Sequence, residues 1–209
     1  MIDIGSLNVN GSYKSIFDPE RFDYTGVDME PGEGVDLVLQ TPYQLPFEDA
    51  SMDLVISGQM LEHNKFFWLS FEEIFRILRP GGLCFMIAPS RGEIHRYPLD
   101  CYRFYPDAYV AMAEHTDSIL IDCWLDTDGT WGDLTGVFFK PDGTDVVPFD
   151  TSSLDTIGGP SVQFMEAAYR AEIYLKQRDK ARQALERREA EVADLKKELI
   201  RLEASLIKN

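Results

Sequence analysis

The feature that most constrains this chain is the alternation of short apolar runs with helical patterns along its first 140 residues. The run LCFMIAP at 83–89 is apolar throughout, as expected for a strand buried on both faces. Lys65–Arg79 precedes it, and Pro80-Gly81-Gly82 predicts where that helix ends. Its apolar face comprises Phe67, Phe71, Ile74, Phe75 and Leu78. With the strand-like runs MIDI, RFDYTGVD, VDLVL and MDLVIS, this order predicts an α/β fold with a doubly wound, mostly parallel sheet.

Two later apolar runs break the alternation. SILIDCWL at 118–125 and TGVFFK at 135–140 have no helical segment between them. Residues 126–133, rich in Gly, Asp and Thr, join them. A short polar connection between two strands is typical of a hairpin, so we expect one late strand to run antiparallel to the rest.

Composition excludes several classes of protein. No run of about 18 apolar residues is present, so we expect no membrane span, and the N-terminus shows no secretory signal. The three cysteines lie far apart, without the spacing of a zinc site or a disulfide framework, so we expect no metal and a cytoplasmic setting. Residues 1–169 carry 9 Lys and Arg against 28 Asp and Glu. Such an acidic body disfavours a nucleic-acid substrate.

The C-terminal part has a different pattern. Residues 147–161 are rich in Pro, Gly, Ser, Thr and Asp and are interpreted as a linker between a domain at 1–146 and a long helical tail at 162–209. In the tail, Leu185, Val192, Leu199 and Leu206 recur every seven residues, with Leu195 and Leu202 at the matching second position. This repeat predicts a coiled coil and a homo-oligomer formed through the tail. The alternative is a single amphipathic helix packed on the body.

The first apolar run leads into a candidate ligand site. Gly5 follows it, and Asp28 ends the next strand, 23 positions later. An acid at this place in a doubly wound sheet typically accepts hydrogen bonds from ribose hydroxyls. The loop G-S-L-N-V-N-G lacks the glycines that approach a pyrophosphate, and no phosphate-binding lysine follows it. An acid for ribose without a phosphate cradle favours S-adenosylmethionine, which carries no phosphate.

Several segments in order carry a family resemblance: DIGS, YTGVDMEPG, YQLPFEDASMDLVISGQMLEH and ILRPGGLCFMIAP. On these motifs Met1–Lys140 resembles a class I S-adenosylmethionine-dependent methyltransferase of the type 11 family. The resemblance implies a seven-stranded, Rossmann-like sheet whose last strand is antiparallel. It also implies an enzyme with S-adenosyl-L-methionine as cofactor.

The resemblance implies roles for individual residues. Asp28 would bind the ribose, Met29 would pack on the adenine and Leu45 would close the adenine pocket. The methionine part would lie against the loop and the strand end formed by Gly5, Ser6, Ser57, Gly58 and Gln59. Glu62 and His63 would cap this region, with His63 either making a structural hydrogen bond or contacting the acceptor.

The chain departs from the family pattern at three places. Leu7 and Val9 stand where the family has its later glycines. Thr41-Pro42 replaces Asp-Ala, so Thr41 would accept only weakly from adenine, Pro42 has no N–H, and Tyr43 is the substitute. Family members usually carry a helix before the first strand that covers the cofactor. We expect either a shortened form or another covering segment.

The loop SRGEIHRYPLDCYRFYPDAY at 90–109 follows the apolar run at 83–89 and is predicted to bind the methyl acceptor. His95 is the candidate catalytic base, because histidine changes charge near neutral pH. Asp100, also assigned to catalysis, would orient His95 or hold a hydroxyl. Arg103 would bind an acidic group of the acceptor or pair with Asp100. Tyr97 and Tyr102 would line the substrate pocket.

These observations predict methyl transfer to a small molecule or glycan, with an oxygen atom as the acceptor. Methylation of nitrogen or of a carboxyl group, which needs no base at His95, remains open. A different class also remains open, an assembly module with weak or no catalysis that oligomerises through its coiled coil.

Overall fold

The computed structural model describes residues 1–126, 128–149, 182–183 and 187–188. The chain divides into two units, Met1–Ala168 and Tyr169–Asn209, and the sheet belongs to the first. Residues 182–183 and 187–188 are helical and exposed. Otherwise the predicted tail at 162–209 and its coiled coil lie outside the described residues, as does the predicted linker beyond 149.

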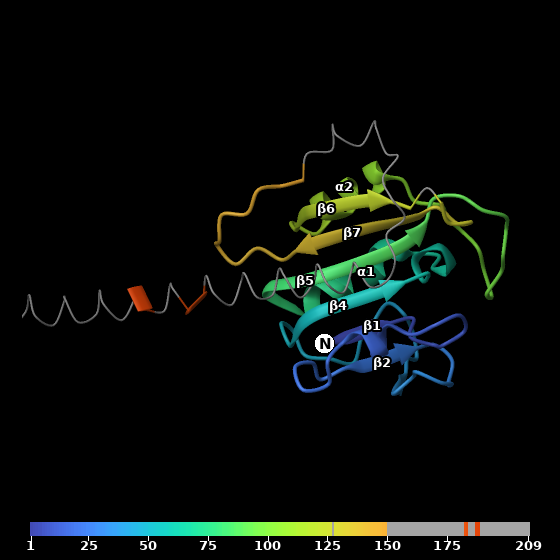
Figure 1. The fold of residues 1–209 in the computed structure, drawn as a ribbon, viewed down its shortest axis with the longest axis horizontal. Helices are drawn as coiled ribbons and strands as arrows, with labels where there is room; N and C mark the ends of the chain where they lie inside the picture. The colour runs from blue at the N-terminus through green and yellow to red at the C-terminus, as the bar shows by residue number, and fades with distance from the viewer. Residues whose placement is uncertain (127, 150–181, 184–186, 189–209) are drawn as a thin grey trace, which may run out of the picture. The chain divides into compact units, whose positions relative to one another are not determined.

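The first unit contains a seven-stranded sheet with the order β3-β2-β1-β4-β5-β7-β6. Figure 1 shows the order from β2 to β6. The central strands β4 and β5 are the longest of the parallel ones, and the sheet confirms the predicted doubly wound fold. The strands are β1 (Ile2–Ile4), β2 (Thr25–Asp28), β3 (Leu37–Val38), β4 (Met52–Gly58), β5 (Leu78–Pro89), β6 (Ile119–Leu125) and β7 (Asp133–Phe139).

The strand directions confirm the predicted hairpin. From β3 to β5 all neighbouring strands pair in parallel. Strand β7 runs antiparallel to both of its neighbours, with Met86 of β5 and Cys123 of β6 each opposite Gly136. A Cβ atom on Gly136 would lie 2.4 Å from the ring of Tyr109, so the close packing of α2 on this strand requires glycine.

Two α-helices and two short 3₁₀ helices connect the strands: α1 (Phe67–Ile77), α2 (Pro106–His115), η1 (Tyr13–Ile16) and η2 (Leu61–His63). The predicted helix end at Pro80-Gly81-Gly82 is wrong, because α1 ends at Ile77 and these three residues belong to β5. Leu78 is buried and pairs with Met52 of β4. This pairing begins β5 immediately after the helix. The Lys140 ammonium donates to the Leu78 carbonyl at 2.7 Å and also to the Phe75 carbonyl, and so caps the helix end.

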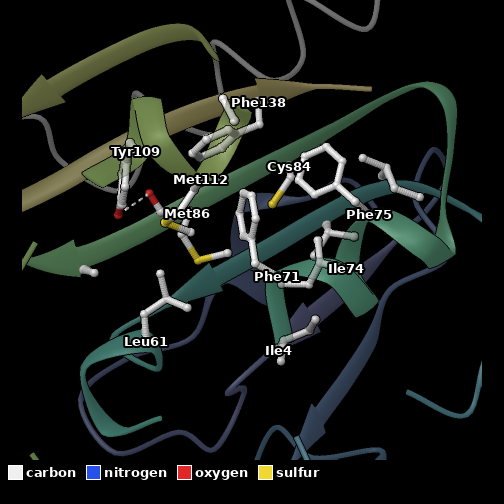
Figure 2. Close-up of a cluster of buried hydrophobic side chains, with 14 of the residues drawn as sticks. Ile4, Leu61, Phe71, Ile74, Phe75, Cys84, Met86, Tyr109, Met112 and Phe138 are labelled. Atoms are coloured by element: carbon white, nitrogen blue, oxygen red, sulfur yellow. Dashed lines mark hydrogen bonds between the residues drawn. The ribbon is translucent and has the colours of Figure 1, made fainter. Parts of the chain in front are cut away.

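The core lies between α1, α2 and one face of the sheet (Figure 2). Phe71 of α1 is fully buried and its ring centroid lies 5.0 Å from that of Phe138 in β7. Tyr109 of α2 is also fully buried, and its hydroxyl donates to the carbonyls of Met86 and Leu134, at 3.3 and 3.1 Å. These bonds satisfy the one polar atom that α2 brings into the core here.

The strand order reverses between β1 and β4, because the chain moves outward to β2 and β3 and then returns. Ligands of doubly wound sheets bind beyond the carboxyl ends of the strands at such a reversal. Gly5 follows β1 there and Gln59 follows β4. None of the helices that the structure describes is both long and apolar enough to cross a membrane.

Candidate active site

The loop after β1 turns sharply at Gly5. Its φ angle is +84°, and a Cβ atom there would lie 3.0 Å from the Met60 Cβ, so both the conformation and the space require glycine. The Gly5 and Ser6 N–H groups both donate to the Val27 carbonyl, at 2.9 and 3.1 Å. The buried Ser6 hydroxyl has no hydrogen-bond partner among the described residues. The loop thus holds an unpaired polar atom beside the strand ends.

Asp28, the predicted ribose acid, ends β2 next to this loop. Its Oδ2 accepts the Leu7 N–H at 3.1 Å, and its Oδ1 accepts the Glu30 N–H at 3.1 Å. Each carboxylate oxygen can accept a second hydrogen bond. Asp28 therefore fixes the loop after β1 and keeps acceptor capacity for a ligand.

The residues predicted to bind adenine lie on the segments after β2 and β3. The Met29 side chain is 45% exposed and so is available to pack on a ring. Thr41 Oγ1 accepts the Tyr43 N–H at 3.3 Å, which occupies part of its acceptor capacity. Leu45 is buried at 3% exposure in the core. Leu45 therefore packs within the core under this region. Met29 is exposed and Tyr43 is half-buried, so both are accessible to a ligand.

The end of β4 uses its polar side chains internally. The buried Ser57 hydroxyl donates to the Ile4 carbonyl at 2.7 Å and so ties β4 to β1. Gln59 has a φ angle of +58°, which is uncommon for a residue other than glycine. Its side-chain amide donates to Asp133 Oδ1 at 2.8 Å. The Ser57 hydroxyl therefore stabilises the pairing of β4 with β1. The Gln59 backbone forms the turn after β4, and its side chain contacts Asp133 at the start of β7.

Tyr13 of η1 covers the end of β4 and was not predicted as a site residue. It is buried, and a Cβ atom on Gly58 would lie 2.0 Å from its hydroxyl oxygen. Tyr13 begins η1 after β1, and no pattern in the sequence indicates that its side chain contacts Gly58. The covering segment over β4 is therefore η1 within the described residues.

Glu62 and His63 form most of η2, just beyond β4. Glu62 is completely buried, and neither carboxylate oxygen has a hydrogen-bond partner among the described residues. Burial raises the pKa of Glu62 to about 8. His63 Nδ1 contacts the Leu99 carbonyl, while its Nε2 lies 3.6 Å from Glu62 Oε1. Burial also lowers the pKa of His63.

Asp100 and Arg103 form a two-bond ion pair within the predicted acceptor loop. Arg103 Nη1 lies 2.5 Å from Asp100 Oδ1, and Nη2 lies 2.9 Å from Oδ2. Arg103 also donates to the carbonyls of Tyr102 and Glu93, at 2.7 and 2.8 Å. The Arg103 guanidinium holds the pKa of Asp100 well below its usual range. Two roles were expected for Arg103, binding an acidic group of the acceptor or pairing with Asp100. In the structure Arg103 pairs with Asp100.

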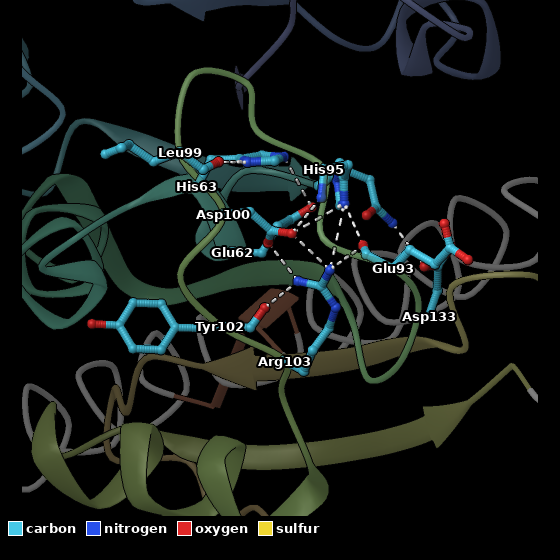
Figure 3. Close-up of polar contacts among 10 residues, drawn as sticks. Glu62, His63, Glu93, His95, Leu99, Asp100, Tyr102, Arg103 and Asp133 are labelled. Atoms are coloured by element: carbon cyan, nitrogen blue, oxygen red, sulfur yellow. Dashed lines mark hydrogen bonds and ion pairs between the residues drawn. The ribbon is translucent and has the colours of Figure 1, made fainter.

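His95 lies between this ion pair and His63 (Figure 3). Its backbone N–H donates to Asp100 Oδ2 at 2.7 Å, and its Nδ1 lies 3.4 Å from the same oxygen. The His95 ring centroid lies 4.9 Å from that of His63 and 4.3 Å from that of Trp131. Asp100 thus fixes the position of His95 mainly through the backbone.

The two tyrosines predicted to line a substrate pocket differ. Tyr97 is 55% exposed. The Tyr102 hydroxyl donates to the Lys65 carbonyl at 2.7 Å, and its ring packs against Phe67 at the start of α1. Tyr102 therefore attaches the loop to α1, and only Tyr97 presents a largely open aromatic face.

Glu62 is the site residue whose importance was not predicted. Its place in the sequence predicts only part of a cap, although a charged residue between Leu61 and His63, shortly after a buried strand, is a signal of its own. The structure brings it together with His63 and His95, which come from two separate segments.

Comparison with known proteins finds similar folds and a sequence match over part of the chain. Residues 7–86 match the family model described as "Methyltransferase domain". A curated protein of Mycolicibacterium gilvum, called "Uncharacterized methyltransferase", is 33% identical over 84 residues, covering 35% of this chain and 33% of that protein. The chain therefore spans about one third of the length of this relative.

Solved structures with the same fold have low sequence identity. A 1,6-didemethyltoxoflavin-N1-methyltransferase from Burkholderia thailandensis, with bound 1,6-didemethyltoxoflavin and S-adenosylhomocysteine, has a TM-score of 0.56 and 17% identity, covering 68% of this chain and 70% of that one. The [4+2]-cyclase SpnF has a TM-score of 0.53 and 14% identity, covering 68% and 75%. The chain thus has the Rossmann-like methyltransferase fold and is similar to the methyltransferase-domain family over residues 7–86.

Proposed function

We propose that this chain is an S-adenosylmethionine-dependent methyltransferase that transfers the methyl group to an oxygen atom of a small molecule or glycan. The observation that carries this proposal is Asp28, an acid with spare acceptor capacity at the strand reversal, beside a loop without a phosphate cradle. The family match over residues 7–86 supports it. So does the similar fold of the Burkholderia enzyme, which binds S-adenosylhomocysteine.

The residues at the strand ends fit this cofactor. Asp28 would accept from the ribose hydroxyls, and Met29 would pack on the adenine together with Tyr43. The Ser6 hydroxyl, buried and without a partner among the described residues, would bind the methionine part. Gly5 provides the positive φ angle that the turn beside this cofactor requires. When bound, the cofactor supplies a methyl group already activated by its sulfonium.

The protein's own contribution is to orient the acceptor and remove its proton. Orientation alone contributes up to roughly 7–11 kcal/mol in favourable systems. A positioned base adds about 10²–10⁴-fold. His95 is the proposed base, because Asp100 fixes its backbone and its side chain, about one third exposed, is accessible to an acceptor. Tyr97 offers an aromatic face to a sugar or ring.

The charge of the chain favours the acceptor class. Its formal net charge is −16, which disfavours polyanions such as nucleic acids. Arg103 is occupied by Asp100, so it does not recruit an acidic acceptor in this arrangement. A neutral hydroxylated acceptor is consistent with both observations.

One observation favours a second candidate, an assembly module with weak or no catalysis. The Tyr13 hydroxyl occupies the space directly against Gly58, where the methionine part is expected. SpnF, described as a [4+2]-cyclase, also has a similar fold, so fold alone does not determine the reaction. Cofactor binding separates the two candidates.

The first experiment is calorimetric titration of the full chain with S-adenosylmethionine and S-adenosylhomocysteine. Asp28→Ala should weaken binding at least about tenfold, because charge-assisted hydrogen bonds to the ribose are lost. Glu30→Ala removes an exposed carboxylate two residues away and should leave the affinity unchanged. No binding to the wild-type chain would leave the assembly module as the function.

The second experiment addresses the base. A screen of sugars and small hydroxylated acids with labelled cofactor identifies an acceptor. With that acceptor, His95→Ala should lower turnover about 100-fold while cofactor affinity stays constant. Near-normal turnover in this variant would instead indicate an acceptor that needs no deprotonation, such as an amine or a carboxylate.

A further inference from the structure

Glu62, His63 and His95 form a cluster of side chains that does not include the cofactor residues at β1 and β2. One ligand-type atom from each of the three side chains lies within 4.8 Å of the others. Glu62 and His63 belong to η2, whereas His95 lies on the loop after β5. Figure 3 shows the two imidazoles and Glu62 converging above Arg103.

Glu62 and His63 face each other, and once Glu62 is deprotonated both present acceptors. His63 Nδ1 contacts a carbonyl oxygen, which can only accept, so Nδ1 carries the proton and Nε2 presents a lone pair. That lone pair lies 3.6 Å from Glu62 Oε1. Glu62 is completely buried and without a hydrogen-bond partner among the described residues. A positive centre between the two groups would satisfy both.

His63 also has the arrangement that metal-binding histidines use. In such histidines the second ring nitrogen typically donates to a carbonyl or carboxylate, which fixes the tautomer and the ring orientation. The Leu99 carbonyl fills this role for His63. His95 Nδ1 lies 3.3 Å from the Glu93 carbonyl and 3.4 Å from both Asp100 Oδ2 and Arg103 Nη2.

The surrounding charge favours a divalent cation. Asp100 is paired with Arg103 at 2.5 Å, and Asp133 Oδ1 accepts from the Gln59 amide. The charge of a deprotonated Glu62 has no such partner among the described residues, so a bound cation would neutralise it. Two imidazoles and one carboxylate suit zinc and its neighbours in the first transition series.

We propose that Glu62, His63 and His95 bind a divalent transition-metal ion, with Zn²⁺ as the probe; a coordinated His95 has no lone pair left to act as the base, so the two roles of His95 exclude each other. Zinc bonds of about 2.0–2.2 Å place two ligand atoms at most roughly 4 Å apart, which the Glu62–His63 pair meets. The His95 ligand atom lies within 4.8 Å of the other two, so His95 must move on its loop to reach this range. Three protein ligands leave a coordination position open to solvent or an acceptor. Cysteine spacing, the criterion that predicted no metal, does not detect such a site.

The experiment titrates the full chain with Zn²⁺ alone, in competition with a chromophoric chelator and without S-adenosylmethionine. One ion per chain should bind. Glu62→Gln and His95→Ala should each weaken binding at least about tenfold, because even the loss of a residue that supports a ligand costs 10–100-fold. His95 lies in a loop and is part-exposed, so its variant remains informative if Glu62→Gln does not fold.

His115→Ala is the matched control. His115 is the third histidine of the chain and pairs with Glu72 at 2.7 Å on the surface, so it tests for ordinary surface binding. Its replacement should leave the high-affinity ion in place. The proposal is overturned if the wild-type chain binds no Zn²⁺ at micromolar concentration, or if loss of His95 has no more effect than loss of His115. Because no cofactor is present, neither result depends on methyl transfer.

Discussion

The Tyr13 hydroxyl lies against the backbone of Gly58 so closely that a Cβ atom on Gly58 would come within 2.0 Å of it. Tyr13 is buried at 8% exposure, and burial raises the pKa of its phenol. The contact joins η1, which follows β1, to the end of β4. It therefore couples the two strands on either side of the strand reversal.

Replacement of Gly58 by Ala should destabilise the chain by about 1–3 kcal/mol, because the added methyl group overpacks a buried contact. Tyr13→Phe in the same chain should recover part of this loss, since the nearest clashing atom is removed. Urea unfolding of the two single variants and the double variant measures the coupling. Additive effects would show that Tyr13 moves freely away from Gly58.

The Asp100–Arg103 pair should contribute far more to stability than a surface pair. Asp100 is only 2% exposed and Arg103 19%, so Arg103→Leu leaves a buried carboxylate without its partner. We expect a loss of about 3 kcal/mol or more. The double variant with Asp100→Asn should lose less than the sum of the single losses.

The pair Arg79–Asp53 provides the control for that cycle. Its atoms are equally close, at 2.5 Å, but the side chains are 33% and 51% exposed. Its coupling energy should stay below about 1 kcal/mol. Equal coupling in both cycles, measured by urea unfolding, would contradict a special role for the loop pair.

Asp3 should give the stability a pH dependence. It is 1% exposed on β1, and its burial raises the pKa from 3.8 to about 6, although the Tyr24 hydroxyl donates to one oxygen. Between these two values the folded chain holds a proton that the unfolded chain releases. The contribution of Asp3 to stability is therefore complete below about pH 3.8 and is lost as the pH rises to about 6.

The variant Asp3→Asn tests this slope, because the amide stays neutral and can still accept from Tyr24. The wild-type chain should lose up to about 3 kcal/mol through this group between pH 4 and pH 6, at 1.36 kcal/mol per unit of pKa shift. The variant should lose correspondingly less. Parallel curves in urea titrations across this range would rule out Asp3 as their cause.

The tail leads to a separate prediction. Its heptad repeat predicts that the full chain is a homodimer or larger oligomer held by residues after about 182. Light scattering should find an oligomer for the full chain and a monomer for a chain ending near residue 161. If both are monomeric at micromolar concentration, the heptads belong to a docked helix or to a site for another protein.

Periodicity was sufficient to predict the sheet and the hairpin. The run at 83–89 and the hairpin runs at 118–125 and 135–140 identify β5, β6 and β7. Burial on both faces explains the continuous apolar runs of β5 and β7, whereas β6 is an edge strand in which only Leu120 and Cys123 are buried. The helix end was missed because glycine and proline signal a break in local structure but do not say which element they break. Here the pairing of Leu78 with Met52 decided it.

The site was less predictable, because its contacts join residues distant in the chain. Asp28 was found from its spacing to Gly5, which the fold constrains. The approach of His95 to His63 depends on the path of a long loop, which no local pattern specifies. The hydrogen bond from the Ser57 hydroxyl to the Ile4 carbonyl likewise follows from strand register, not from residue type.

The hydrogen bond from the Leu7 N–H to Asp28 has a consequence for the thermodynamics of ligand binding. It orders the loop after β1 when the chain folds, so that loop brings little conformational entropy to be lost later. A ligand at the strand ends would therefore meet a preorganised surface. Replacing Asp28 should then make the entropy of association less favourable as well as removing contacts, a signature that calorimetry resolves from a loss of enthalpy alone.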